Sequence, residues 1–182
     1  MRRTGALALF LLSAACAIAK QPDSARTVAA FEVPVSTADD RQELLTMLSE
    51  VAQAERLHLD VATREELQAT SATYRQTISA AVWRGKDDDE SIASVMDAPD
   101  HLPWIMFSKG EDEKLSREFK DRAVSRIRER WPNTLSLPIM PTGAIPLPRQ
   151  LIRTPKGYAV SPETLAEYQA EEKKIQDMED GG

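Results

Sequence analysis

The segment WIMFSKGEDEKLSREFKDRAVSRIRERWPNTLSLPI, residues 104–139, carries the clearest structural signals of the chain. Trp104–Phe107 is apolar at every position, which is typical of a strand covered on both faces. A helical pattern follows the strand and ends at Pro132. Residues 135–139 then alternate as another strand, and Pro138 favours a position at a sheet edge. The helix predicted over 110–131 has apolar residues at helical spacing: Leu115, Phe119, Ala123, Ile127 and Trp131.

The preceding residues contain a second strand and helix. Residues 28–35 alternate as a strand, and Ser36 and Thr37 are capping residues for a helix that runs to about residue 56. Two further strands, 74–84 and 91–97, are predicted to pair as a hairpin across a polar turn. Between the helix and the hairpin, 57–61 alternates, and Thr63 to Glu66 forms a capping box that predicts a short helix.

The main elements therefore follow the order strand, helix, strand, strand, helix, strand. This order predicts an α+β fold, a ferredoxin-like split βαβ sandwich with an antiparallel sheet and two main helices. The edge position expected from Pro138 agrees with that topology. We expect this α+β domain to span 28–148, a C-terminal turn and helix to occupy 149–176, and 177–182 to form a flexible tail.

The first residues have the pattern of a secretory signal. Two arginines precede an apolar run at 6–12, which is too short to span a membrane, and small residues follow. Leu12-Ser13-Ala14-Ala15-Cys16 resembles the lipobox of bacterial lipoproteins, although Ser13 stands where that motif usually has leucine. The alternative is ordinary signal-peptidase cleavage after Ala19.

The resemblance implies removal of signal peptide 1–15, or of 1–19 under ordinary cleavage, and a lipid on Cys16. Cys16 is the single cysteine of the chain, so the mature body has no internal disulfide. Residues 16–27 are then a tether to the membrane. By resemblance, Ala17 in place of an aspartate favours the outer membrane, facing the periplasm, over the inner membrane. Ordinary cleavage implies a soluble periplasmic or secreted protein instead.

The charge of the chain argues against nucleic-acid partners. The whole sequence has 23 Lys plus Arg and 29 Asp plus Glu. Removal of Arg2 and Arg3 with the signal leaves a net charge of about −8. An acidic exported domain is poorly suited to binding nucleic acid or anionic lipid headgroups.

Catalytic and metal-binding signals are weak. His101, with Asp97 and Asp100 beside it, is the best candidate for a catalytic group, but no nucleophile elbow accompanies it. The acidic run Asp87, Asp88, Asp89 and Glu90 could attract a hard cation, yet it lacks the ligand spacing of a calcium loop. It reads more simply as a solvated hairpin tip. The sequence predicts no cofactor.

Two other groups of residues admit a binding role. Arg122, Arg126 and Arg130 share one helical face and could bind an acidic partner, although nearby acidic residues favour a solvated face. The chain's tryptophans, at 83, 104 and 131, are most simply core or interface residues.

Three functions are compatible with these signals. The first is a non-catalytic protein-binding module of the bacterial envelope, either an accessory subunit or an inhibitor or immunity-type protein. Its expected contact surfaces are the proline-rich segment 138–148 and the C-terminal helix. The second is a periplasmic hydrolase that uses the His101 loop. The third is a small-ligand carrier, which would need an apolar cavity between sheet and helices.

Overall fold

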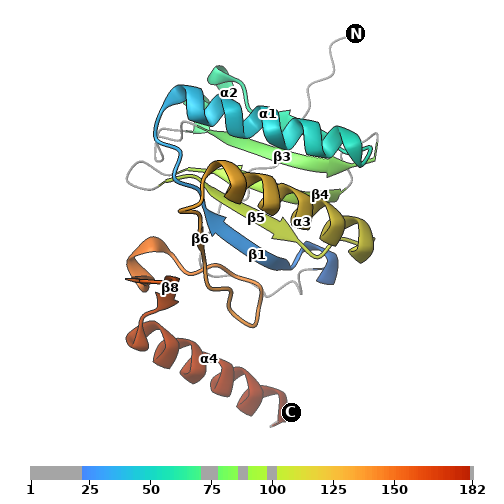
Figure 1. Ribbon diagram of the computed structural model, residues 1–182. Helices are drawn as coiled ribbons and strands as arrows, with labels where there is room; N and C mark the ends of the chain where they lie inside the picture. The colour runs from blue at the N-terminus through green and yellow to red at the C-terminus, as the bar shows by residue number, and fades with distance from the viewer. Residues whose placement is uncertain (1–21, 71–77, 86–89, 98–101, 181–182) are drawn as a thin grey trace.

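The computed structural model describes residues 22–70, 78–85, 90–97 and 102–180 (Figure 1). A short 3-10 helix, Asp23–Ala25, precedes a six-stranded antiparallel sheet with the order β2-β3-β4-β5-β1-β6. The strands are β1 (Thr27–Glu32), β2 (His58–Val61), β3 (Ser79–Arg84), β4 (Glu90–Met96), β5 (Trp104–Ser108) and β6 (Leu135–Ser136).

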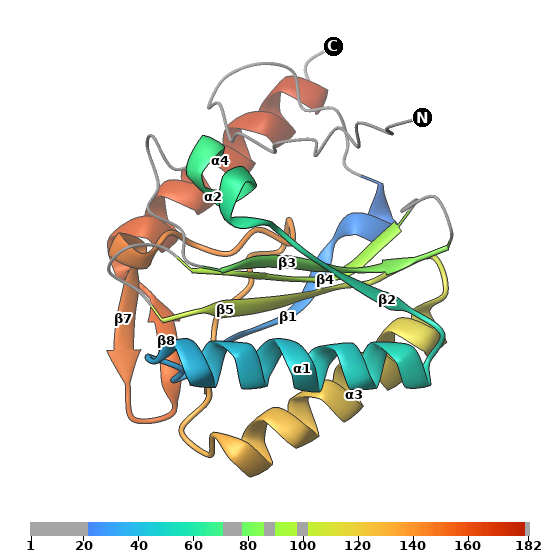
Figure 2. The ribbon, with the colours of Figure 1, turned by 90° about the horizontal axis from the view of Figure 1, so that it is seen from above.

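Helices lie on both sides of this sheet (Figure 2). The long helices α1 (Ala38–Ala54) and α3 (Glu113–Arg130) cover one face. The short α2 (Arg64–Thr70) and the C-terminal α4 (Pro162–Asp180) lie on the opposite side. A separate hairpin of β7 (Leu151–Thr154) and β8 (Gly157–Val160) connects the sandwich to α4.

The topology confirms the predicted fold class. Strands β6-β1-β5-β4 have the order of a split βαβ sandwich, with α1 after β1 and α3 between β5 and β6. The connection from α1 to β4 contains β2, α2 and β3, which extend the sheet beyond that core by two strands. The short strand and short helix expected within 57–72 are both present. Their addition makes β2, rather than β4, the far edge of the sheet.

Side-chain caps fix where the long helices begin. The Thr37 hydroxyl accepts a hydrogen bond from the Asp40 N–H at 3.0 Å, and the Asp112 carboxylate accepts one from the Leu115 N–H at 3.1 Å. The second helix therefore begins at Glu113 rather than at the predicted residue 110. Gly110 has a φ of +74° and lies in the preceding loop.

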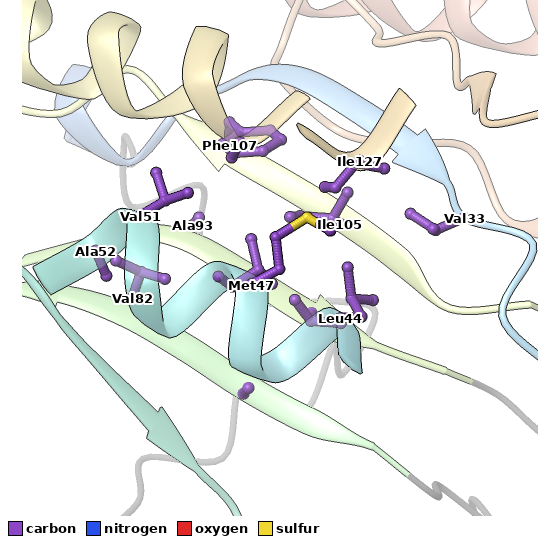
Figure 3. Close-up of a cluster of buried hydrophobic side chains, with 14 of the residues drawn as sticks. Val33, Leu44, Met47, Val51, Ala52, Val82, Ala93, Ile105, Phe107 and Ile127 are labelled. Atoms are coloured by element: carbon purple, nitrogen blue, oxygen red, sulfur yellow. The ribbon is translucent and has the colours of Figure 1, made fainter. Parts of the chain in front are cut away.

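The core fills the layer between the long helices and the sheet (Figure 3). Leu44 and Leu48 of α1, Phe119 of α3, and Ile105 and Phe107 of β5 are each at most 1 % exposed. In Figure 3, Met47 points from α1 toward Ile105 and Ile127. These described side chains occupy the space in which a carrier would need its cavity, so this layer lends no support to the carrier hypothesis.

Three details differ from the sequence expectations, and a fourth is mostly outside the described residues. Strand β5 is fully covered on one face, where Ile105 and Phe107 are buried, and only partly covered on the other, where Trp104 and Met106 are half-buried. Within the tether expected at 16–27, Asp23–Ala25 instead forms a 3-10 helix that docks on the body: the Gly110 N–H donates to the Ser24 carbonyl at 2.8 Å. The tail expected from 177 continues α4 as far as residue 180. Most of the strand start expected at 74–78 lies outside the described residues.

Candidate functional site

The candidate catalytic residues lie only partly within the described structure. His101 and Asp100 fall outside the described residues. Asp97 follows β4 and is buried, and its carboxylate accepts a hydrogen bond from the Ile78 N–H at 2.9 Å. Its other oxygen lies 3.7 Å from Nε of Arg41 in α1. These contacts tie the start of β3 and helix α1 to the end of β4, which is a structural role for this carboxylate.

The acidic run is also only partly described. Asp87, Asp88 and Asp89 fall outside the described residues, and the Glu90 carboxylate accepts hydrogen bonds from the Arg84 guanidinium at 3.4 Å and from the Glu111 N–H. Glu90 therefore links the β3–β4 hairpin to the loop before α3. Within the part of the chain that the structure describes, no group of three metal-ligating side chains comes together.

The three arginines of α3 lie on an exposed face, as the sequence favoured, and form ion pairs with acidic residues of α1 and its C-cap. Arg122 pairs with Glu55 at 2.6 Å, Arg126 with Glu50 at 2.8 Å, and Arg130 with Glu43 at 2.7 Å. Hydrogen bonding to Glu43, followed by its charge, raises the pKa of Arg130. The partners come from α1 and its C-cap residue Glu55 rather than from α3 itself or from another protein, so this face is not a free cationic surface.

A buried carboxylate that sequence analysis missed lies on the other face of the sheet. Glu32 of β1 is 6 % exposed and accepts hydrogen bonds from the Tyr158 hydroxyl at 2.8 Å and the Trp104 indole N–H at 3.3 Å. Burial and then the hydrogen bond to Glu32 raise the pKa of Tyr158. Because Tyr158 belongs to β8, this contact fastens the C-terminal hairpin to the sheet.

Two of the three tryptophans lie on this same face. Trp104 pairs with Glu32 across β5 and β1, and Trp83 lies at the far end of the face beside β2. Both are half-buried, and the buried Trp83 indole N–H has no hydrogen-bond partner among the described residues. Trp131 differs, since it is buried within the main core, as expected.

Strand β2 lies at the edge of the described sheet. Among the described strands it pairs with β3 alone, in the antiparallel register Leu59↔Val82 and Asp60↔Ala81. The Ala62 N–H continues that ladder by donating to the Ser79 carbonyl at 2.9 Å. Hydrogen-bonded and non-hydrogen-bonded pairs alternate along an antiparallel ladder. Asp60 therefore bonds inward to β3, whereas the N–H and C=O groups of Leu59 and Val61 point outward.

No hydrogen bond engages these outward groups within residues 22–70, 78–85, 90–97 and 102–180. The side chains add to the open character of the edge. Val61 is 41 % exposed although it lies on the helix-covered face, where its neighbours Ala80 and Val95 are buried. Asp60 and His58 lie on the opposite face and are exposed. We define the β2 edge as His58, Leu59, Asp60 and Val61, and take it as the candidate site.

Comparison with known proteins gives no guide to this site. No family model, curated protein or solved structure matches the chain. The functional interpretation therefore depends on the geometry of the chain's own residues. Sequence analysis recognised 57–61 as a possible strand, but its edge position depends on pairing with β3, which one strand's pattern does not encode. The signal for Glu32 was a charged residue inside an apolar strand, between Phe31 and Val33.

Proposed function

We propose that this protein is an exported bacterial lipoprotein that acts as a non-catalytic protein-binding module. It is anchored through Cys16 in the outer membrane, faces the periplasm, and serves as an accessory subunit or as an inhibitor of a periplasmic protein. The observation that supports the binding role is the β2 edge, which leaves backbone donors and acceptors of Leu59 and Val61 without partners among the described residues. Such an edge is a template for strand addition by another protein.

The anchoring part of the proposal depends on the N-terminal sequence. Cys16 lies outside the described residues, and none of the described helices is long and apolar enough to cross a bilayer. A lipid chain would supply membrane attachment, and several acyl chains anchor stably where a single chain does not. The short stretch between Cys16 and the docked 3-10 helix would then hold the domain close to the membrane surface.

Two measurements test the two parts separately. The mature protein in the membrane fraction of fractionated cells should have the intact mass of residues 16–182 plus acyl groups. The Cys16→Ala variant should remain unprocessed or be released from the membrane fraction. A bare mass that starts at Lys20 in the soluble fraction would refute anchoring. The binding role predicts a stoichiometric partner in a pull-down from solubilised envelope. The Val61→Thr variant, which keeps the backbone N–H at the β2 edge, should capture the same partner. Failure to recover any partner would refute the binding role.

A further inference from the structure

We infer that the β2 edge binds an extended segment of another protein as an added antiparallel strand, with apolar side chains opposite Leu59 and Val61 and a basic side chain opposite Asp60. This inference rests on the proposed binding function and specifies the chemistry of the partner at that site. Three features of the edge carry it: the direction of its backbone groups, the exposure of its apolar side chains, and the charge between them.

The backbone sets the register of the added strand. Leu59 and Val61 turn their N–H and C=O groups outward, because Asp60 uses its own groups in the ladder with β3. A strand that satisfies both residues must form hydrogen-bonded pairs with them. Its intervening residue then lies opposite Asp60 in a non-hydrogen-bonded pair, in which the Cα atoms are about 4.5 Å apart and the side chains are closest.

The side chains set which residues the partner needs. Leu59 is half-buried and Val61 is 41 % exposed, and both point to the face that α1 and α3 cover. On that face of the next strand, Ala80 and Val82 are 6 % and 1 % exposed. The apolar layer therefore continues to β2, where the exposure of its side chains rises to 41 % at Val61. Apolar residues at alternate positions of an added strand would bury Val61 as the inner strands bury their own residues.

Asp60 distinguishes a foreign strand from a second copy of this chain. If two copies paired antiparallel with both Leu59 and Val61 bonded, each Leu59 would face the other copy's Val61. The two Asp60 residues would then face each other in the close pair. Like charges directly opposite one another destabilise strand pairing, whereas a lysine or arginine there is favourable. The charge therefore opposes self-association in this register and selects a partner with a basic residue.

The test uses the purified mature protein and two synthetic peptides, Ac-STVKVTS-NH2 and Ac-STVEVTS-NH2. Amide hydrogen exchange at Leu59 and Val61 is followed by NMR as each peptide is added. The lysine peptide should slow exchange of both amides, and the glutamate peptide should bind about tenfold more weakly, equivalent to about 1.4 kcal/mol. Asp60→Lys should reverse this preference, which a general effect on the fold would not do.

Val61→Pro removes one outward donor and leaves the inward ladder intact, so it should weaken binding of the lysine peptide about tenfold. Val61→Thr, which keeps the N–H, should retain binding. Absence of protection by either peptide, or protection that is equal for both, overturns the inference. Protection that rises with protein concentration without peptide also overturns it, because the occupant is then a second copy.

The pull-down described above separates this inference from the proposed function. A partner that is captured by the wild type and Val61→Thr, but is lost with Val61→Pro, supports both. A partner that Val61→Pro captures equally well overturns the docking site and leaves the binding function standing. Recovery of no partner refutes the function, and the peptide experiment still decides whether the edge accepts a basic strand.

Discussion

The two edges of the sheet differ in how they are closed. At the β6 edge, the Leu137 N–H donates to the Ala30 carbonyl at 2.9 Å, and Pro138 follows. The β7–β8 hairpin packs there: a Cβ at Gly157 would lie 2.8 Å from the Ser136 carbonyl oxygen. At the opposite edge, β2 has four residues without a proline, and no described strand or hairpin lies on the side away from β3.

The two edges of the sheet are therefore protected against unwanted strand pairing in different ways. The β6 edge is protected by structure, since a short strand, a proline and a packed hairpin leave little backbone to pair. The β2 edge is short and carries Asp60, which opposes self-pairing but permits a basic partner. The closed edge holds the C-terminal unit of the same chain, and we assign the open edge to another protein.

The largest effect should come from a proline that tests the register of β2. Asp60→Pro removes an inward ladder donor and should lower the free energy of unfolding by about 3 kcal/mol. Val61→Pro removes an outward donor and should cost less than about 1 kcal/mol. Urea denaturation followed by circular dichroism measures both. Equal costs would contradict the assigned direction of the backbone groups.

The next effect tests the closed edge. Gly157→Ala places a Cβ against the Ser136 carbonyl at a residue whose φ is +138°, where side chains are strained. We expect a loss of about 2 kcal/mol in the free energy of unfolding, with faster amide exchange confined to β6, β7 and β8. The same substitution at Gly85 of the β3 turn is the comparison, because it should leave exchange in these strands unchanged. Unaltered exchange in β8 would show that close packing at Gly157 does not hold the hairpin.

A smaller effect is expected from Tyr158→Phe. The substitution leaves one oxygen of the buried Glu32 carboxylate without its donor and should cost about 1–2 kcal/mol. The pKa of Tyr158 is raised above its ordinary value of 10.0 in the folded protein, so its contribution is present below pH 10 and is lost as the pH rises through the folded-state pKa.

The raised pKa of Tyr158 also predicts how stability changes at alkaline pH. Wild-type stability, measured by urea denaturation, should decline above about pH 10, and Tyr158→Phe should flatten that decline. Tyr168→Phe is the matched control, because Tyr168 of α4 donates to no carboxylate within the described part of the chain and its loss should leave the wild-type decline in place. Identical pH profiles for the wild type and Tyr158→Phe would contradict the contact with Glu32.

The fold was largely predictable because its signals are local. The spacing of Leu115, Phe119, Ala123 and Ile127 placed α3, and all four face the core or pack against it. The position of Pro138 agreed with the edge location of β6. Helix ends were predicted less well: the apolar spacing predicted a helix from residue 110, whereas the Asp112 cap makes α3 begin at Glu113.

The candidate site was less predictable because it depends on pairing between distant strands. Glu32 becomes a buried acceptor only when β5 and β8 bring Trp104 and Tyr158 to it, from positions 72 and 126 residues away in the chain. The arginines of α3 likewise find partners on α1 that helical spacing within α3 does not reveal. Whether the backbone N–H and C=O groups of Leu59 point away from the sheet is decided by the register of β2 with β3.

Residue-resolved amide exchange of the isolated mature protein tests the central claim, an open β2 edge, most directly. The His58 and Asp60 amides should be protected by pairing with β3, whereas the Leu59 and Val61 amides should exchange at nearly the rate of an unprotected chain. This alternation should be independent of protein concentration. Protection of Leu59 and Val61 in the protein alone would mean that the edge is already covered and would contradict the account.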